Sequence, residues 1–390
     1  MFLKKSNGDK MKAKKIIKQL ALLGFCSSMS FFAHSSSITL YGIINAGVGD
    51  IRTSGKDSSG NYIKRKTTGF VDQGFYGNQF GLKGVEDITG QLKAIFQLES
   101  GFSLATGGSY QGGRLFGRQA TVGLRHSQFG QLEFGRQTNM TFKAIGNMAS
   151  PFGGNGWQVG IGATIPAANV VRYDNLILYQ TPNWNGFQAG VGYSFNTDGS
   201  QFPRTSEGVS LDEANIKATT IGMSYQSGDF AMGFGFEQND YGSLRSTATG
   251  FVPREAGKVN TWNLGARYDF KRFKIHAGIG QSRNGMISPS LVDAQYGVGY
   301  REGLRFNSYL LGVTVPVGAS NDLLASVGLI DPRSVPEGGQ AAMQRAYNLG
   351  WMTHMSKRTS IYALAGYAEK VGFYNDMKAS FYTVGLAHKF

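Results

Sequence analysis

Apolar and polar residues alternate at every second position over many segments of this sequence, and this pattern limits its fold more than any other feature. Between 258 and 269, Trp262 and Leu264 alternate with Asn263 and Gly265. The same alternation recurs over 273–283, 307–316 and 381–390. Residues at i and i+2 lie on one face of a strand, so a period of two predicts β-strands with one apolar face.

The two faces of these strands differ in a way that indicates their surroundings. Glycine and arginine gather on one face, as expected for a water-filled lumen, and aliphatic and aromatic residues on the other would meet lipid. Only 16% of the chain is charged, against roughly 25% in soluble domains. A soluble sandwich would instead bury its apolar faces together and carry charge outside. Because strands in hydrocarbon must pair every backbone polar group, the sequence predicts an all-β, closed antiparallel transmembrane β-barrel.

We count sixteen strand candidates, joined alternately by seven short turns and eight long loops. They begin near Ile38, Gln79, Leu92, Phe116, Gln131, Val170, Phe187, Lys217, Phe230, Lys258, Phe273, Gly303, Asp322, Gln344, Thr359 and Lys378. The long loops include 51–78 and 138–169. Short periplasmic turns and long outer loops are the layout of a transmembrane barrel. Assignment from a single sequence leaves the count open by about two strands.

The first 35 residues have the layout of a secretory signal peptide. Lysines precede an apolar run over 20–32, and Ala33-His34-Ser35 offers small residues for cleavage after Ser35. The run is shorter than the roughly 20 residues of a spanning helix, which argues against a bitopic anchor. We therefore expect a signal peptide at 1–35 and a barrel domain at 36–390, with translation starting at Met1 or Met11.

Charge and cysteine content exclude several classes of protein. Seven lysines and one aspartate in 1–35 account for +6 of the net charge of +14, which leaves +8 on the mature chain. The mature part has one basic block, Lys64-Arg65-Lys66, so we expect no nucleic-acid partner. The charge is instead expected to serve a pore or anionic lipopolysaccharide. The only cysteine, Cys26, lies in the signal segment, which excludes a disulfide framework and a cysteine metal site.

Seven short motifs, spread in order over the mature chain, resemble the Gram-negative general porins of the beta-proteobacterial branch. They lie at 37–42, 79–87, 92–102, 116–124, 134–137, 356–359 and 384–390. The resemblance implies a sixteen-stranded homotrimer of the outer membrane, with its third outer loop folded into the lumen. It implies passive diffusion of small hydrophilic solutes and ions. The barrel-assembly machinery would read the C-terminal aromatic residue, Phe390.

The expected functional elements are a constriction loop and a basic wall, because pore selectivity follows the radius and the charges lining it. Loop 138–169 has Lys143 as its only charge. Its core is Pro151, Phe152, Gly153 and Gly154, where glycine permits tight turns with positive φ. With no acidic residue in this loop, the pore is expected to favour anions.

The candidates for the basic wall are Arg118, Arg172, Lys83, Arg136 and Arg267. Arg118 and Arg172 match positions where the family keeps pore arginines. The alternative for each of them is a solvated residue at a strand end. Two features depart from the family. Gln79 stands where it has another arginine, and Leu176 and Leu178 occupy expected lumen positions of the sixth strand.

Aromatic residues near strand ends are expected to form girdles at the two membrane interfaces, where amphipathic rings are favoured. The candidates are Tyr41, Tyr179, Trp184, Trp351, Tyr382 and Phe390. The four histidines of the mature chain are scattered at 126, 276, 354 and 388. No pattern of a zinc site, phosphate loop or catalytic triad appears, so we expect no enzyme activity, metal or cofactor. The first strand follows the signal directly, which argues against a receptor with an N-terminal plug.

Overall fold

The computed structural model describes residues 37–56, 60–153, 171–205, 208, 210–286, 299–336 and 342–390. The expected signal peptide at 1–35 lies outside these residues. Within the described ranges, no helix has the length and apolar character needed to cross a bilayer.

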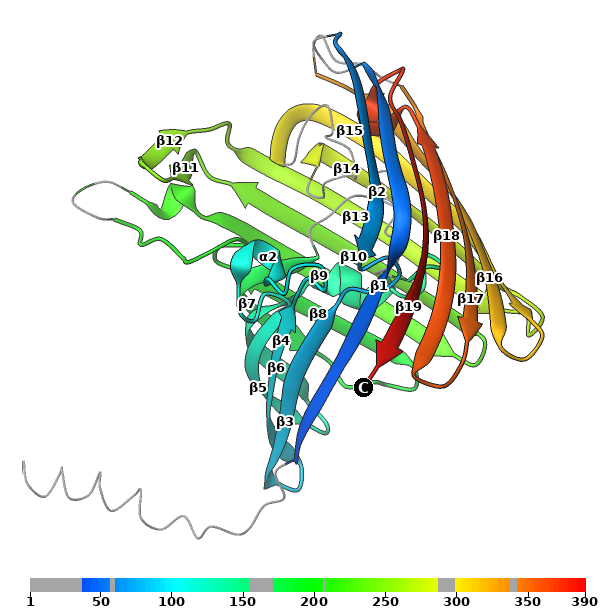
Figure 1. The fold of residues 1–390 in the computed structure, drawn as a ribbon. Helices are drawn as coiled ribbons and strands as arrows, with labels where there is room; N and C mark the ends of the chain where they lie inside the picture. Colours follow the sequence, from blue (N-terminus) through cyan, green and yellow to red (C-terminus); the bar gives the residue numbers. More distant parts are fainter. Residues whose placement is uncertain are drawn as a thin grey trace, which may run out of the picture.

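The described chain is built almost entirely of β-strands (Figure 1). The strands are β1 (Ser37–Lys56), β2 (Tyr62–Asp72), β3 (Gln79–Thr89), β4 (Leu92–Gly101), β5 (Gln119–His126), β6 (Gly130–Thr138), β7 (Arg172–Gln180), β8 (Phe187–Ser194), β9 (Ile216–Ser227), β10 (Phe230–Tyr241), β11 (Leu244–Thr247), β12 (Gly250–Pro253), β13 (Gly257–Asp269), β14 (Lys274–Met286), β15 (Gly299–Val317), β16 (Asn321–Ser334), β17 (Gln344–His354), β18 (Thr359–Glu369) and β19 (Lys378–Lys389). Short helices are α2 (Tyr110–Gly113), α3 (Met140–Ile145), η1 (Asp212–Ala214) and η2 (Val371–Phe373).

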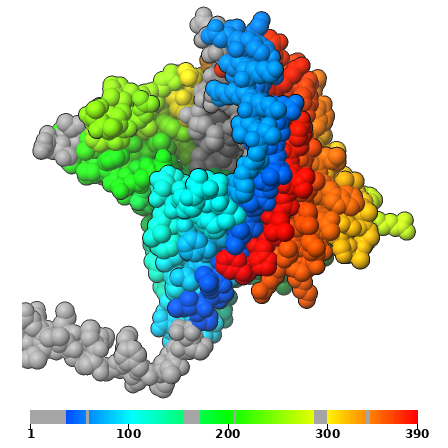
Figure 2. Space-filling view, in the orientation of Figure 1, coloured from blue at the N-terminus to red at the C-terminus, as the bar shows by residue number. Residues whose placement is uncertain are grey.

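The main sheet closes into a barrel because its first and last strands pair. β1 and β19 are antiparallel over Ile43–Ser54 and Lys378–Lys389, and they lie side by side in Figure 2, in blue and red. The pairing continues past the end of β19, where Gly42 and Phe390 each donate a backbone N–H to the other's carbonyl at 3.1 Å. The terminal strand therefore leaves no open edge toward lipid.

The barrel wall is sixteen strands around, as predicted, although its sheet contains seventeen strands, because two of them share one position. β2 pairs with the second half of β1 and β3 pairs with the first half, both antiparallel, on the side opposite β19. β2 and β3 together therefore occupy one strand position of the barrel, with a break between them. Each predicted strand has a counterpart that begins within a few residues of the predicted start.

The loop predicted over 51–78 is wrong, because β1 continues to Lys56 and β2 returns beside it. Most residues of β2 are exposed on both faces. It therefore has no apolar face, and a search for alternation misses it. The hairpin of β11 and β12, which projects from the barrel in Figure 1, also lies in a predicted loop.

Burial alternates along the strands with the apolar residues outside. In β17, Tyr347, Leu349 and Trp351 are exposed, whereas Ala346 and Asn348 between them are buried. The large aliphatic and aromatic side chains thus face away from the lumen, and small or polar ones face inward. This inside-out arrangement is that of a barrel surrounded by lipid.

Candidate functional site: the pore constriction and external mouth

The third outer loop begins with helix α3, whose ends are capped locally. The Asn139 side chain accepts a hydrogen bond from the N–H of Phe142 at 3.0 Å, and Gly146 donates to the carbonyl of Phe142 at 2.9 Å. Asparagine is a favoured N-cap because its side-chain oxygen satisfies an otherwise unpaired N–H. The helix therefore starts directly after β6 and turns the chain away from the rim.

Helix α3 lies on a track of glycines on the inner faces of three strands. A Cβ added at Gly190 of β8, Gly222 of β9 or Gly233 and Gly235 of β10 would lie under 3.0 Å from an atom of α3. Side chains at these positions would push the helix off the wall. The glycines that the alternation placed on the lumen face thus form the seat of the loop.

Buried polar groups fasten the start of α3 to this seat. The N–H of Met140 donates to the hydroxyl of Thr220 at 2.7 Å, and the N–H of Thr141 donates to Oε1 of Glu237 at 3.2 Å. Thr220 also donates to Glu237 at 2.7 Å. Two backbone donors of the helix are therefore satisfied by the barrel wall, where no water reaches them.

Beyond α3 the loop continues across the inner wall. His276 of β14 lies 2.9 Å from the carbonyl oxygen of Met148, and a side chain at Gly312 of β15 would overlap Pro151. Phe152 is buried and packs in one cluster with Leu324 and Met352. Gly153 has a φ of 63°, as its glycine permits. Gly154 and the rest of the predicted loop lie outside the described residues.

Leu176 and Leu178 do face inward, and α3 covers them. Both are fully buried in a cluster with Met140, Tyr173 and Ala218. The start of the constriction loop thus seals this apolar patch. The two leucines pack against the loop and do not line open water.

Arg118 lies in a buried network on the inner face. Its Nε donates to Oε1 of Glu99 at 2.6 Å, and Oε2 of Glu99 accepts from the hydroxyl of Tyr41 at 2.8 Å and from Gln79 at 3.3 Å. Gln79 therefore joins the arginine site instead of adding charge to it. The prediction that Tyr41 belongs to a lipid-facing girdle is wrong, because its hydroxyl points to the lumen side.

Arg136 and Arg172 lie on the neighbouring wall, above α3. Arg136 pairs with Asp174 at 2.6 Å and donates to the carbonyl of Gly117 at 2.7 Å. Arg114 also reaches Asp174, at 3.2 Å. The Nε of Arg172, in contrast, is buried and has no hydrogen-bond partner among the residues that the structure describes. Arg172 is therefore the less neutralised of the two.

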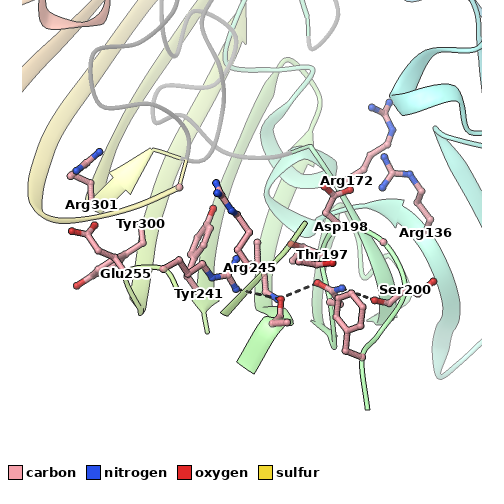
Figure 3. Close-up of a pocket in the computed structure, with 18 residues that line it drawn as sticks. Arg136, Arg172, Thr197, Asp198, Ser200, Tyr241, Arg245, Glu255, Tyr300 and Arg301 are labelled. Carbon is pink, nitrogen blue, oxygen red and sulfur yellow. Dashed lines mark hydrogen bonds between the residues drawn. The ribbon is translucent and has the colours of Figure 1, made fainter. Parts of the chain in front are cut away.

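Arg136 and Arg172 also line a cavity of about 910 Å³ at the end of the barrel where the long loops lie (Figure 3). Its opposite side carries three further arginines and two tyrosines, from the end of β10, the β11–β12 hairpin and the segment after it, and the start of β15, and sequence reasoning missed all five. They are Arg245, Arg254, Arg301, Tyr241 and Tyr300.

A family model described as Gram-negative porin matches residues 20–372. The chain belongs to this family. It is 34% identical over 397 aligned residues to an outer membrane porin protein of Bordetella pertussis, an alignment that covers 97% of this chain and 100% of the relative. It is 28% identical to outer membrane porin protein 32 of Delftia acidovorans, with 95% and 93% covered.

Solved structures share the fold of this porin. The anion-selective porin from Comamonas acidovorans has a TM-score of 0.66 at 24% identity, and the match covers 91% of this chain and 100% of that one. The trimer form of OmpT from Vibrio cholerae has a TM-score of 0.61 at 14% identity, with 91% and 100% covered. The porin lies in the outer membrane of a Gram-negative bacterium and forms a general diffusion pore.

Of the remaining predicted pore cations of the porin, Lys143 and Arg267 lie apart from the arginine group, and Lys83 borders it through Tyr41. The ammonium of Lys143 is held against the wall by Gln180 at 2.8 Å and Gln137 at 3.1 Å, with Glu133 at 3.7 Å. Lys83 lies over the ring of Tyr41, 5.5 Å from its centroid. Arg267 pairs in register with His276, near the turn between β13 and β14. The structure thus brings together Arg118, Arg136 and Arg172 only.

The other predicted girdle residues lie on the outer surface of the porin. Tyr179 donates its hydroxyl to the carbonyl of Phe129 at 2.8 Å, beside a short turn, and Trp184 stacks on Phe187. Trp351, Tyr382 and Phe390 are exposed, and they project from the apolar face of their strands. Their orientation is that of interfacial aromatic residues in a barrel.

Proposed function

We propose that this porin is an anion-favouring general diffusion channel with no reaction centre of its own. The proposal is carried by the charge of the constriction loop's own residues, together with the environment of Arg172. The constriction loop contains no aspartate or glutamate, and the buried Nε of Arg172 lacks a partner within the described residues. An uncompensated guanidinium at a narrow passage attracts anions and repels cations. The structurally similar porin from Comamonas acidovorans is described as anion-selective, which supports the same direction.

The reversal potential in a KCl gradient across a planar bilayer tests this proposal. We expect the sign of an anion-selective channel, and a cation-selective sign would refute the preference. Arg172→Gln should lower the ratio of chloride to potassium permeability. Lys357→Gln, which removes an exposed charge in a short turn far from α3, is the matched control and should leave the ratio unchanged.

A liposome-swelling assay distinguishes a passive diffusion channel from a barrel that acts only as an enzyme or as a gated receptor. Liposomes that contain the purified porin should swell in isotonic solutions of small sugars, at rates that fall with solute size. Liposomes without passive uptake would refute the diffusion channel.

We further propose that the porin assembles as a homotrimer in contact with lipopolysaccharide, after cleavage of residues 1–35. The trimer form of the OmpT relative supports this assembly. The basic block Lys64-Arg65-Lys66 lies on β2, which is exposed on both faces and suits contact with an anionic lipid. Conductance steps in groups of three would support the trimer, and single steps only would refute it. N-terminal sequencing of the mature protein tests the cleavage site.

Phe390 is proposed as the residue that the barrel-assembly machinery reads. Its backbone is fixed to Gly42 in the folded barrel, while its ring stays exposed. Phe390→Ala should reduce the yield of porin in the outer membrane while the refolded protein still conducts. An unchanged yield in cells would refute the proposal.

A further inference from the structure

The cavity at the external mouth has the size and the shape of a ligand site. Its volume of about 910 Å³ lies in the range of pockets that hold small organic molecules. It is lined by residues of the segment after β8, the end of β10, the β11–β12 hairpin and the segment after it, the start of β15, and the wall at β6 and β7. Solutes that approach α3 from outside pass this cavity.

The cavity is rich in positive charge, although one of its arginines, Arg136, is paired with Asp174 at 2.6 Å. Five arginines line it, against the carboxylates of Asp198 and Glu255, and Asp198 is already paired with Arg114 at 2.7 Å. Among the residues that the structure describes, Arg254 donates to two carbonyl oxygens, those of Gly242 at 2.5 Å and Ala214 at 3.4 Å. Such bonds orient a guanidinium without neutralising its charge, so it remains available to an anion.

The arginines form two groups that face the cavity from different sides. Figure 3 shows Arg136 and Arg172 on one side, and Arg245 and Arg301 toward the other. Guanidinium groups bind carboxylates in a planar, often bidentate geometry. Two separate groups therefore suit a ligand with a carboxylate at each end better than they suit a single small ion.

Two tyrosine rings, those of Tyr241 and Tyr300, lie on the same side of the cavity as Arg245 and Arg301 (Figure 3). The ring of Tyr300 packs directly on Gly257, where a Cβ would overlap it, and the ring of Tyr241 lies 3.6 Å from the Cβ position of Gly299. The guanidinium of Arg254 lies over the ring of Tyr241, 5.5 Å from its centroid. Because glycines let both rings lie close to the backbone, they provide flat apolar surface beside the arginines. Flat rings of this kind favour stacking with an aromatic ligand.

We propose that the mouth cavity binds flat aromatic dicarboxylates, which the porin concentrates there before they pass the constriction. The proposal rests on the anion-favouring channel proposed above and names a class of solute for it. Each carboxylate would meet one arginine group, and the aromatic body would lie against Tyr241 and Tyr300.

Single-channel recording with three probe anions added on the loop side tests the proposal. Terephthalate has two carboxylates on a ring, benzoate has one, and succinate has two without a ring. Terephthalate should interrupt the KCl current at concentrations at least about tenfold lower than either of the others, since one charged hydrogen-bonding group contributes about that much. If all three anions interrupt the current at equal concentrations, the proposal is overturned.

Substitutions on β11 and at the start of β15 locate the site. The double variant Arg245→Gln with Arg301→Gln should raise the effective terephthalate concentration at least about tenfold. Tyr300→Leu should reduce the preference for terephthalate over succinate. Arg333→Gln, on an exposed arginine paired with Asp331 elsewhere on the rim, is the matched control. Unchanged terephthalate block in the double variant would overturn the proposal.

The reversal potential of the same channels separates this inference from the proposed function. Anion selectivity without preferential terephthalate block refutes the cavity as a binding site and leaves the anion-favouring pore standing. Preferential block in a cation-selective channel supports the binding site and refutes the proposed selectivity.

Discussion

The backbone N–H of Thr141 in the constriction loop donates a hydrogen bond to the buried carboxylate of Glu237 on the barrel wall, at 3.2 Å. Both residues are fully enclosed. Through this contact, an acid on β10 holds the first turn of α3, and with it the start of the loop for which a constriction is predicted.

Glu237→Ala should therefore loosen the loop. The variant leaves the N–H of Thr141 and the hydroxyl of Thr220 without their acceptor, at a cost of about 1–3 kcal/mol for each buried group. We expect a lower unfolding temperature by circular dichroism and a noisier open-channel current. Glu237→Gln keeps an acceptor oxygen and should show much smaller changes. Identical current noise in the alanine variant and the parent would contradict the role assigned to Glu237.

Gly235→Val should narrow the pore. A Cβ at Gly235 would overlap Thr141 of α3, so the helix must shift toward the lumen, with an overpacking cost of about 1–3 kcal/mol. We expect a lower single-channel conductance. Gly328→Val on β16 is the matched control, because the nearest atom to its Cβ position is 4.0 Å away. If the two variants lower conductance equally, α3 is not seated on the glycine track.

Arg118→Gln should shift selectivity toward cations more than the loss of one positive charge explains. Arg118 and Glu99 form a buried ion pair, so the variant leaves the carboxylate of Glu99 without its cation. Adding Glu99→Gln should restore most of the original permeability ratio. A double variant that remains as cation-selective as Arg118→Gln would show that the two charges act independently on the pore.

Because of Lys143, the stability of the folded porin should depend on pH in the alkaline range. Burial lowers the pKa of Lys143 below its ordinary value of 10.5, despite the opposing effect of Glu133. Below the lowered pKa, the folded state pays the full desolvation penalty of the ammonium. As the pH rises through that value, the folded state loses the proton first, and stability increases up to about pH 10.5. Unfolding temperatures over this window should rise in the parent and stay flatter in Lys143→Met.

The strand pattern was predictable because each barrel strand has one face in lipid, and this produces the alternation of apolar and polar residues in the sequence. Prediction from alternation missed β2, β11 and β12, because both faces of these strands meet solvent or other chain segments and no apolar face is required. The orientation of Tyr41 could have been predicted. Ile38 and Leu40 are exposed on the lipid side, so Tyr41, one position later, belongs to the opposite face.

The external mouth could not be predicted in the same way. Arg245, Arg254 and Arg301 lie in or next to loops with no periodic signal, and only the closed barrel brings them opposite Arg136 and Arg172. The inward position of loop 138–169 rested on family resemblance. Its physical reason, the glycine track under α3, becomes visible only when strands distant in sequence are placed side by side.

The glycine track also divides the pore wall into a part that can vary and a part that cannot. At Gly190, Gly222, Gly233 and Gly235 the wall has no side chains beneath α3, and a larger residue at any of these positions would displace the helix. Changes of pore radius on this side can therefore come only from the loop itself. The neighbouring wall, with Arg118, Arg136 and Arg172, lies outside this glycine track. Homologues of this porin could therefore change which solutes pass by altering the loop and the arginine wall, while the glycine-bearing strands β8, β9 and β10 stay the same.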